Sequence, residues 1–199
     1  MEKTSELVWL YVKRRPFLKE AIRQRIVNYS ALARQITSET FGKKDQQYAV
    51  KMALIRLASK MREGEENPEQ RIKAVLKKSS MSIRTKVAVL ISTRKLEKLD
   101  YISCAESRGT TTYILEESGL GRYKKAKTTL KAETNLDLIS IHSGPDLEKA
   151  PGVISHLLAA LAGEGINVVE FVSCYTDTLL VVRQADTARA HEILAGMMR

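Results

Sequence analysis

The sequence predicts an α+β protein, with helices in the first part of the chain and a helix-covered sheet in the rest. Up to about residue 80, apolar residues recur at the three- and four-residue spacing of amphipathic helices. From residue 82, β-branched and aromatic residues gather in short runs typical of strands. The last segment, 136–199, alternates the two patterns in the order β-α-β-β-α. The 199 residues, 44% of them apolar, suffice for one large core or two small ones.

The helices of the first part are short and separated by recognisable breaks. Pro16 suits the first turn of a helix, and Ser30 is a good N-cap. Phe41-Gly42 ends the helix that Ser30 begins, and the acidic stretch 63–68, which closes on a proline, is a clear break. The expected helices cover 6–13, about 16–26, about 30–36, about 45–62 and an amphipathic piece with Ile72, Val75 and Leu76.

The middle of the chain has the residue pattern of strands. Strands are expected over 83–92, 101–105 and 110–116, and Ser107-Arg108-Gly109 fits a hairpin turn between the last two. The segment 124–133 fits a strand or a helix, and its alternation of lysines with apolar residues favours an exposed strand.

The last segment offers three strands, where a split βαβ sandwich has four. We therefore predict that a strand from residues 82–133 completes its sheet. The alternative is a three-stranded sheet completed by a second copy of the chain. The expected elements are strands over 136–143, 166–175 and 178–183, a helix over 151–162, and a last helix capped by Asp186.

Three stretches of this segment resemble the ACT domain, a small amino-acid-sensing module, in the form attached to aspartate kinases. They are Ile-Ser-Ile-His-Ser-Gly at 139–144, Ala-Pro-Gly-Val at 150–153 and Leu-Ala-Gly-Glu-Gly-Ile-Asn-Val at 161–168. The resemblance covers about residues 136–198 and keeps the family's order and spacing. It implies a ferredoxin-like fold, an amino-acid ligand and a homodimer formed through ACT domains. The kinase catalytic domain has no counterpart in the sequence.

The residues of this segment suit a zwitterionic ligand. The loop around Gly144 and the helix start at Pro151-Gly152 offer free backbone N–H groups and a positive dipole end to a carboxylate. Asn167 both donates and accepts hydrogen bonds, and the resemblance implies that Glu170 meets the ligand's ammonium group. Alternatively, Pro151-Gly152 only starts a helix and Glu170 is a solvated edge charge. The candidate ligand-binding residues are Ser143, Gly144, Asp146, Pro151, Gly152, Val153, Asn167 and Glu170.

Two departures from the family pattern bear on these residues. The stretch 168–174 is one residue longer than the usual kinase-type strand, which leaves open the face on which Glu170 lies. His142 stands at the mouth of the loop, where the family commonly has a small or apolar residue. It is a ligand contact, a pH sensor or a surface residue.

The first part of the chain resembles a helix-turn-helix variant with a long connection. A short capped helix, a turn at 41–44 and a longer helix from about Asp45 follow one another. Glutamines suit adenine edges and basic side chains suit phosphates. The alternative is a helical dimerisation domain whose lysines are solvated. The candidate DNA-binding residues are Arg34, Lys43, Lys44, Gln46, Gln47, Tyr48 and Lys51.

The charge is divided along the chain. Residues 1–80 carry 18 Lys and Arg against 9 Asp and Glu, residues 81–135 carry 11 against 6, and residues 136–199 carry 4 against 8. The formal net charge of +10 therefore conceals a basic part and an acidic part, which suggests a polyanion partner for the first. The expected domains are a helical one over 1–80, a β-rich segment over 81–135 that completes the sheet or is a degenerate ACT-like unit, and an ACT domain over 136–199.

The sequence does not indicate an enzyme or a cofactor. It contains no phosphate-loop, nucleophile-elbow or dinucleotide signature. His142, His156, His191, Cys104 and Cys174 have no metal-ligand spacing. The longest apolar runs are too short for a membrane span, and the charged start lacks a signal's apolar core. We expect reduced cysteines and a cytoplasmic protein.

These observations lead to the hypothesis of a dimeric, amino-acid-responsive transcription regulator. The two halves of the chain together also resemble a group of small prokaryotic proteins described as predicted regulators of amino-acid metabolism, on residues 26–33 and 50–54. In this hypothesis the ligand binds at an ACT dimer interface and modulates DNA binding by the N-terminal domain. The alternative is an amino-acid-binding subunit that docks onto a biosynthetic enzyme without binding DNA.

Overall fold

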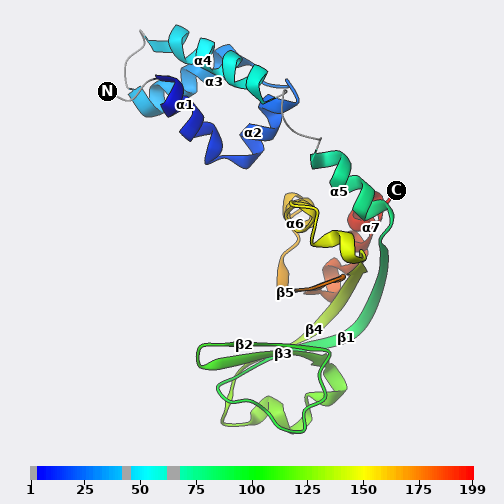
Figure 1. Cartoon of the computed structure of the whole chain (residues 1–199). Helices are drawn as coiled ribbons and strands as arrows, with labels where there is room; N and C mark the ends of the chain where they lie inside the picture. Colours follow the sequence, from blue (N-terminus) through cyan, green and yellow to red (C-terminus); the bar gives the residue numbers. More distant parts are fainter. Residues whose placement is uncertain (1–3, 42–45, 62–67) are drawn as a thin grey trace. The chain divides into compact units, whose positions relative to one another are not determined.

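The chain consists of a helical unit, residues 1–66, and a sheet unit, residues 67–199. The computed structural model describes residues 4–41, 46–61 and 68–199 (Figure 1). The expected α+β fold is confirmed, because helices come first and a six-stranded antiparallel sheet with helices follows in the described part of the chain. No described helix combines the length and the apolar character that crossing a membrane requires.

The helical unit buries one apolar core between its helices. Its described elements are α1 (Thr4–Lys13), α2 (Pro16–Arg23), α3 (Tyr29–Ile36), the π-helical turn η1 (Thr37–Phe41) and α4 (Gln47–Lys60). Each α-helix turns an apolar stripe inward, as the helical spacing predicted. The largest contributions come from Val8, Val12, Ile22, Ile36, Val50 and Leu54, all fully buried.

The start of α3 corrects one prediction. The N-cap is Asn28, whose Oδ1 accepts hydrogen bonds from the backbone N–H groups of Ser30 and Ala31 at 3.1 Å each. Ser30 was predicted as the cap, but the chain already enters helical geometry at Tyr29. Ser30 therefore lies inside the first turn, and an Asn side chain satisfies the free donors instead.

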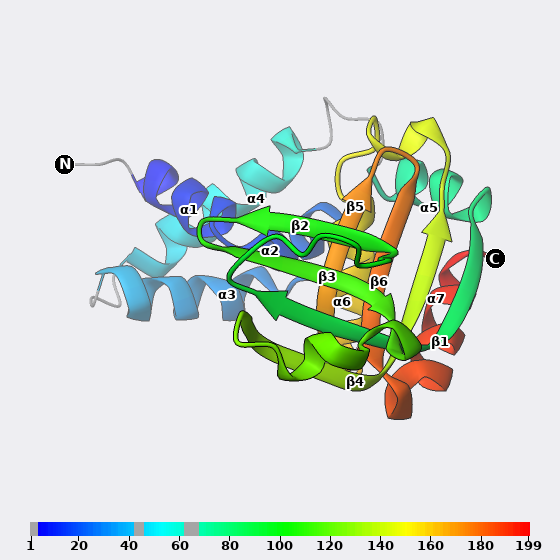
Figure 2. The same cartoon turned by 90° about the horizontal axis from the view of Figure 1, so that it is seen from below.

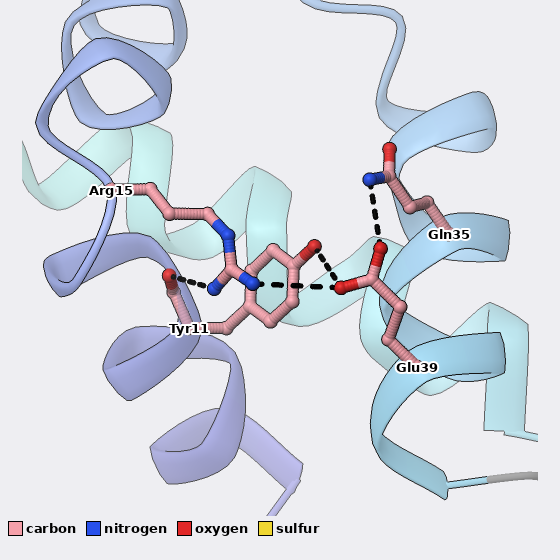
Figure 3. Close-up of polar contacts among 4 residues, drawn as sticks. All are labelled: Tyr11, Arg15, Gln35 and Glu39. Carbon is pink, nitrogen blue, oxygen red and sulfur yellow. Dashed lines mark hydrogen bonds and ion pairs between the residues drawn. The ribbon is translucent and has the colours of Figure 1, made fainter.

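The carboxylate of Glu39 joins η1 to the start of the unit (Figure 3). It accepts hydrogen bonds from the Tyr11 hydroxyl at 2.8 Å and from Gln35 Nε2 at 2.9 Å, and Arg15 Nη2 lies 3.5 Å away. The Arg15 guanidinium also covers the Tyr11 ring, 3.6 Å from its centroid. Hydrogen bonds from Gln35 and Tyr11 hold the pKa of Glu39 below its usual range. These contacts fix the end of α3 and η1 against α1.

The sheet has the order β2-β3-β1-β4-β6-β5, and every neighbouring pair is antiparallel. β1 runs beside β4 along almost its whole length, with Ser80 opposite His142 and Ser92 opposite Thr129. β1 is therefore the predicted strand that completes the sheet. The strands are β1 (Ser80–Ser92), β2 (Ser103–Ser107), β3 (Thr110–Glu116), β4 (Thr129–His142), β5 (Val168–Cys174) and β6 (Asp177–Arg183).

Strand β4 begins earlier than the expected residue 136, and the segment before it is not a strand. Two short 3-10 turns, η3 (Glu117–Gly119) and η4 (Gly121–Lys125), precede β4. The Thr129 hydroxyl donates to the Tyr123 carbonyl at 2.7 Å, which holds η4 against the strand. The predicted strand over 124–133 therefore forms only from Thr129.

Three helices cover one face of the part of the sheet formed by β4, β6 and β5 (Figure 2). They are α5 (Pro68–Lys77), α6 (Val153–Gly163) and α7 (Thr187–Met197). Ile72, Val75 and Leu76 of α5 enter the same core as Leu157 and Leu194. The domain prediction grouped α5 with the helices before it, but its apolar stripe packs on the sheet, so the division between the units comes at residues 66 and 67.

Strands β1 and β4 bend together in their middle. The register between them shifts between Arg84 and Val87 and again between Val87 and Val89. At the bend, Lys86 and Asn135 both have a φ of +58°, a left-handed conformation that residues with a side chain rarely adopt. Figure 1 shows both strands curving from the helix-covered end of the unit to the β2–β3 end.

A buried carboxylate fixes this bend. Asp137 is 2% exposed and accepts hydrogen bonds from the Lys86 backbone N–H at 3.2 Å and from the Thr187 hydroxyl at 2.8 Å. Thr187 is the first residue of α7, so one side chain connects both bent strands to that helix. Asp186, the predicted cap of α7, stands at the N-cap position without making a side-chain cap hydrogen bond.

The bend gives the sheet two further apolar clusters. On the face opposite the helices, Leu138 and Val181 of one half meet Val89 and Ile114 of the other. On the outer face of the β1–β3 end, the loops 93–101 and 117–128 cover Ala88, Leu90, Tyr113 and Leu115. Both halves of the sheet therefore contribute to a shared apolar cluster on the face opposite the helices.

We expect the substitution Asp137→Ala to destabilise the sheet unit by about 2 kcal/mol, because it removes the buried acceptor of both the Lys86 N–H and the Thr187 hydroxyl. Native-state hydrogen exchange of β1 and β4 amides measures the change. Asp186→Ala is the matched control and should change the free energy of exchange by less than about 1 kcal/mol. Equal effects of the two substitutions would contradict this role of Asp137.

Candidate functional site

The loop that follows β4 contains the first group of predicted ligand-binding residues. Ser143 is buried, its backbone N–H donates to the Thr176 carbonyl at 2.8 Å, and its hydroxyl accepts a hydrogen bond from Ser79 Oγ at 2.9 Å. Gly144 has a φ of +71°, and the 3-10 turn η5 (Pro145–Leu147) follows it. Ser143 thus anchors the loop, while the Asp146 side chain within η5 is exposed.

The start of α6 provides an anion-binding geometry. Gly152 is its N-cap, with a φ of +98°, and no side chain caps this end. The Val153 N–H donates to the Ala150 carbonyl at 3.4 Å, and no described side chain accepts from the other N–H groups of the first turn of this 11-residue helix. The helix begins at Val153, two residues later than the predicted Pro151, because the left-handed Gly152 interrupts helical geometry. Val153 is buried in the core and positions the loop.

Asn167 and Glu170 belong to the other part of the predicted site, on and just before β5. The end of β5, Cys174, is opposite Asp177, which is opposite His142 at the loop end of β4. Asn167 precedes the far end of the strand, so it lies roughly 23 Å along β5 from the loop end, at about 3.3 Å per residue. Within one chain, the structure does not bring Asn167 and Gly152 together.

Glu170 lies on the sheet face opposite the helices. A bulge at Val169 absorbs the extra residue of β5 and places Glu170 opposite Val181. Lys131 and Glu133 of β4 form an ion pair of 2.5 Å near it. Burial raises the pKa of Glu170, the Glu133 charge adds to the rise, and the Lys131 charge opposes it. A ligand ammonium group would compensate the cost of ionising this carboxyl.

His142 forms a surface pair at the loop end of the sheet. Its Nδ1 lies 3.1 Å from Asp177 Oδ1, and the Thr176 hydroxyl donates to the other carboxylate oxygen of Asp177 at 2.7 Å. The hydrogen bond from Thr176, followed by that with His142, lowers the pKa of Asp177. Both side chains of the pair are substantially exposed, as a surface role for His142 predicts.

The predicted DNA-binding residues occupy different sides of the helical unit. Arg34 on α3 and Tyr48 on α4 are exposed, Tyr48 at 75%. Gln46, Gln47 and Lys51 are half-buried, and Gln46 Oε1 is a buried atom that has no hydrogen-bond partner among the described residues. The structure thus brings only part of the predicted set to an open surface. Lys43 and Lys44 lie outside the described residues.

The outer face of α4 was missed by the sequence analysis. Val50 and Leu54 define its buried side, and the opposite side carries Tyr48, Arg56 and Lys60. Continuing the helical spacing from Tyr48 would have found them. Beside this face, α1 and α4 form an open groove of about 770 Å³. It is lined by Ser5, Glu6, Trp9, Ala53, Arg56, Leu57, Lys60 and Met61.

Comparison with known families identifies an ACT domain in residues 131–196, from β4 to α7. This range excludes β1, although β1 is the neighbour of β4 in the sheet. No curated protein matches the sequence.

Part of the chain is similar to solved structures. Aspartate kinase of Clostridium acetobutylicum is similar with a TM-score of 0.51 at 11% identity, over 60% of this chain and 35% of that chain. Aspartokinase III of Escherichia coli, in complex with aspartate and ADP, has a TM-score of 0.48 at 15% identity, over 60% of this chain and 33% of that one. A Vibrio cholerae protein of unknown function, described as a possible transport protein, has a TM-score of 0.49 at 15% identity, over 67% of this chain and 100% of that chain. The chain thus spans about a third of the length of the two kinases. At these identities the similarity shows the fold alone.

We expect Gly152→Ala to destabilise the loop and the start of α6 by about 1–2 kcal/mol. The φ of +98° strains any side chain, and an added Cβ would meet Ile72 Cδ1 at 3.2 Å. Gly163→Ala at the other end of α6, where an added Cβ meets nothing within 4 Å, should be neutral or stabilising. Urea unfolding followed by circular dichroism compares the two variants, and a larger loss in Gly163→Ala would contradict the assignment.

We expect Glu170→Gln to be more stable than the wild type at neutral pH. The pKa of Glu170 is raised in the folded state, so folding favours the neutral carboxyl. The contribution of Glu170 to the free energy of unfolding is therefore complete below the pKa of the unfolded state, and it is lost as the pH rises through the pKa of the folded state. The advantage of the variant should vanish below about pH 4. Thermal unfolding over a pH series measures this advantage, and Glu192→Gln, at an exposed position of α7, is the control. An advantage that is independent of pH would contradict the burial argument.

Proposed function

We propose that this chain is an amino-acid-responsive transcription regulator that works as a homodimer. A free amino acid binds between the ACT domains of two copies, and its binding changes how the two helical units engage DNA. The observation that carries the proposal is the ACT domain at 131–196. Within one copy, its candidate carboxylate contacts and its candidate ammonium contacts lie toward opposite ends of β5.

The separation of these contacts supports a site shared between copies. The uncapped start of α6 at Gly152 suits a carboxylate. Asn167 and Glu170 suit the amino group, but they lie toward the opposite end of β5. A two-fold axis that pairs two copies in opposite directions places the loop of one beside the strand of the other. One amino acid can then contact both groups.

The outer edge of β5 is a suitable surface for that pairing. β5 is the last strand of the sheet, so one side of its backbone has no strand partner among the described residues. Val168 and Val172 are half-buried, and Phe171 is 36% exposed. Antiparallel pairing with a second β5 would extend the sheet and cover these side chains.

The helical unit supplies the DNA contacts in this proposal. Arg34, Arg56 and Lys60 are exposed cations, and Tyr48 extends from the same outer face of α4 as Arg56. Phosphate contacts of this kind position a protein on a duplex. A dimer carries two such units, and an effector that favours one packing of the interface alters their spacing on successive grooves.

A second candidate function rests on the groove between α1 and α4. Trp9, Leu57 and Met61 give it apolar walls, and Arg56 and Lys60 stand at its side. An apolar groove with cationic side chains suits an acidic amphipathic helix of another protein. In that case the chain is an amino-acid-binding subunit that docks onto a biosynthetic enzyme without binding DNA.

A thermal-shift screen of the full chain with each of the twenty amino acids tests the effector site. One or a few amino acids should raise the melting temperature, since a ligand at one hundred times its Kd adds about 2.7 kcal/mol to stability. Asn167→Ala and Glu170→Ala should abolish the shift, and Glu192→Gln should retain it. A wild type that responds to no amino acid would overturn the effector site.

Retention on duplex DNA across a salt series separates the two functions. A regulator should bind duplex with an affinity that falls steeply with salt and changes when the effector from the screen is added. A docking subunit should show no retention at physiological salt.

A further inference from the structure

We propose that the sheet unit carries its own surface for the phosphate backbone of nucleic acid. This surface, the basic cap, consists of the two loops 93–101 and 117–128 on the outer face of the β1–β3 end. In Figure 1 these loops lie beyond β2 and β3, at the end of the unit away from α5. The inference concerns a part of the chain distinct from both the ACT site and the helical unit.

The two loops of the basic cap are held together, and to the sheet, by hydrogen bonds of the backbone and of two tyrosine hydroxyls. The Thr93 N–H donates to the Thr128 carbonyl at 2.8 Å. The Tyr123 hydroxyl lies 3.3 Å from the Glu97 carbonyl and 3.2 Å from the Lys98 carbonyl, bridging one loop to the other. The Leu96 N–H donates to the Tyr113 hydroxyl of β3 at 2.8 Å. The cap is therefore a platform fixed to the sheet.

The outer surface of this platform is cationic. Six basic side chains of the two loops are exposed, and none of them forms an ion pair within the described part of the chain. The acidic residues of the same loops are Glu97, Asp100 and Glu117. The six cations are Arg94, Lys95, Lys98, Lys124, Lys125 and Lys127.

Most apolar residues of the cap point inward, and the exception, Tyr101, is 48% exposed with its ring 5.6 Å from that of Tyr113. Leu99 and Leu120 are buried in the cluster beneath the loops, and Leu96 and Tyr123 pack against it. A protein interface generally has an apolar core surrounded by a polar rim. Closely spaced lysines without such a core suit a repeating anion instead, and nucleic-acid backbones are bound by such side chains.

The charge of the rest of the unit supports the same partner. Residues 136–199 carry 4 Lys and Arg against 8 Asp and Glu. A polyanion is therefore repelled by the β4–α7 segment and attracted to the cap. The α5 end of the unit is also basic, with Arg71, Lys73, Lys77 and Lys78 against Glu69, so the experiment includes cations of that end as a control. Much of the basic surplus of residues 81–135 therefore lies in the basic cap.

The test uses the full chain with Lys124, Lys125 and Lys127 each replaced by Gln. Affinity for a mixed-sequence duplex is measured over a sodium chloride series. The slope of log K against log salt should fall by about 0.9 for each phosphate that the variant no longer neutralises, hence by about 2 to 3. The matched control replaces Lys77, Lys78 and Lys149, exposed cations of α5 and the loop before α6, by Gln. It removes the same charge and should leave the slope within about 1 of the wild type.

Three outcomes would contradict nucleic-acid binding by the basic cap. They are an unchanged salt slope in the cap variant, equal losses of duplex affinity in the cap variant and the control variant, or preferential binding of anionic vesicles over duplex. A third variant, Arg34→Gln with Arg56→Gln, separates this inference from DNA binding by the helical unit. If only the cap variant loses affinity for the duplex, the result supports nucleic-acid binding by the basic cap and contradicts DNA binding by the helical unit. If only the third variant loses affinity, the result supports DNA binding by the helical unit and contradicts the basic cap.

Discussion

The sheet unit depends on the way Asp137 holds two strands in a bent conformation. Lys86 and Asn135 adopt left-handed backbone geometry in the two strands at the same level of the sheet, a conformation that costs free energy for residues with a side chain. The buried carboxylate accepts the Lys86 N–H and the Thr187 hydroxyl, so both strands and α7 share one acceptor. Because of this bend, the single pair β1–β4 extends through both the helix-covered half of the sheet and the β2–β3 half. The loop 143–152, the face of the sheet with Glu170 and the loops 93–101 and 117–128 all follow from strands of this bent pair or from other strands of the same sheet.

Much of this architecture was accessible from residue types alone. The helix restart at Pro16, the hairpin at Ser107-Arg108-Gly109 and the need for a fourth strand follow from local chemistry and from a rule of connection. These features depend on a few neighbouring residues or on element order. The structure places them close to where the sequence predicted them.

Other features depend on the competition between distant parts of the chain. The apolar stripe of α5 predicts a helix but does not determine which core that helix packs into. The prediction that α5 belongs to the helical unit was therefore wrong. Lysine carries no signal for a left-handed conformation, so the bend at Lys86 was not predictable. The bulge at Val169 fixes the face of Glu170, and that fixation comes from pairing with β6.

The position of β1 means that the segment recognised as an ACT domain does not contain every strand of its own sheet. The strand that borders β4 precedes it in sequence, whereas the recognised ACT segment starts only at residue 131. A fragment cut at the recognised boundary would lack α5 and β1, and so would expose one edge of β4 and part of the core under α6. The segment that closes the core of the sheet unit is thus the one that follows the helical unit in sequence. A substitution that weakens the pairing of β1 with β4 would open that core, although β1 lies far outside the recognised ACT range.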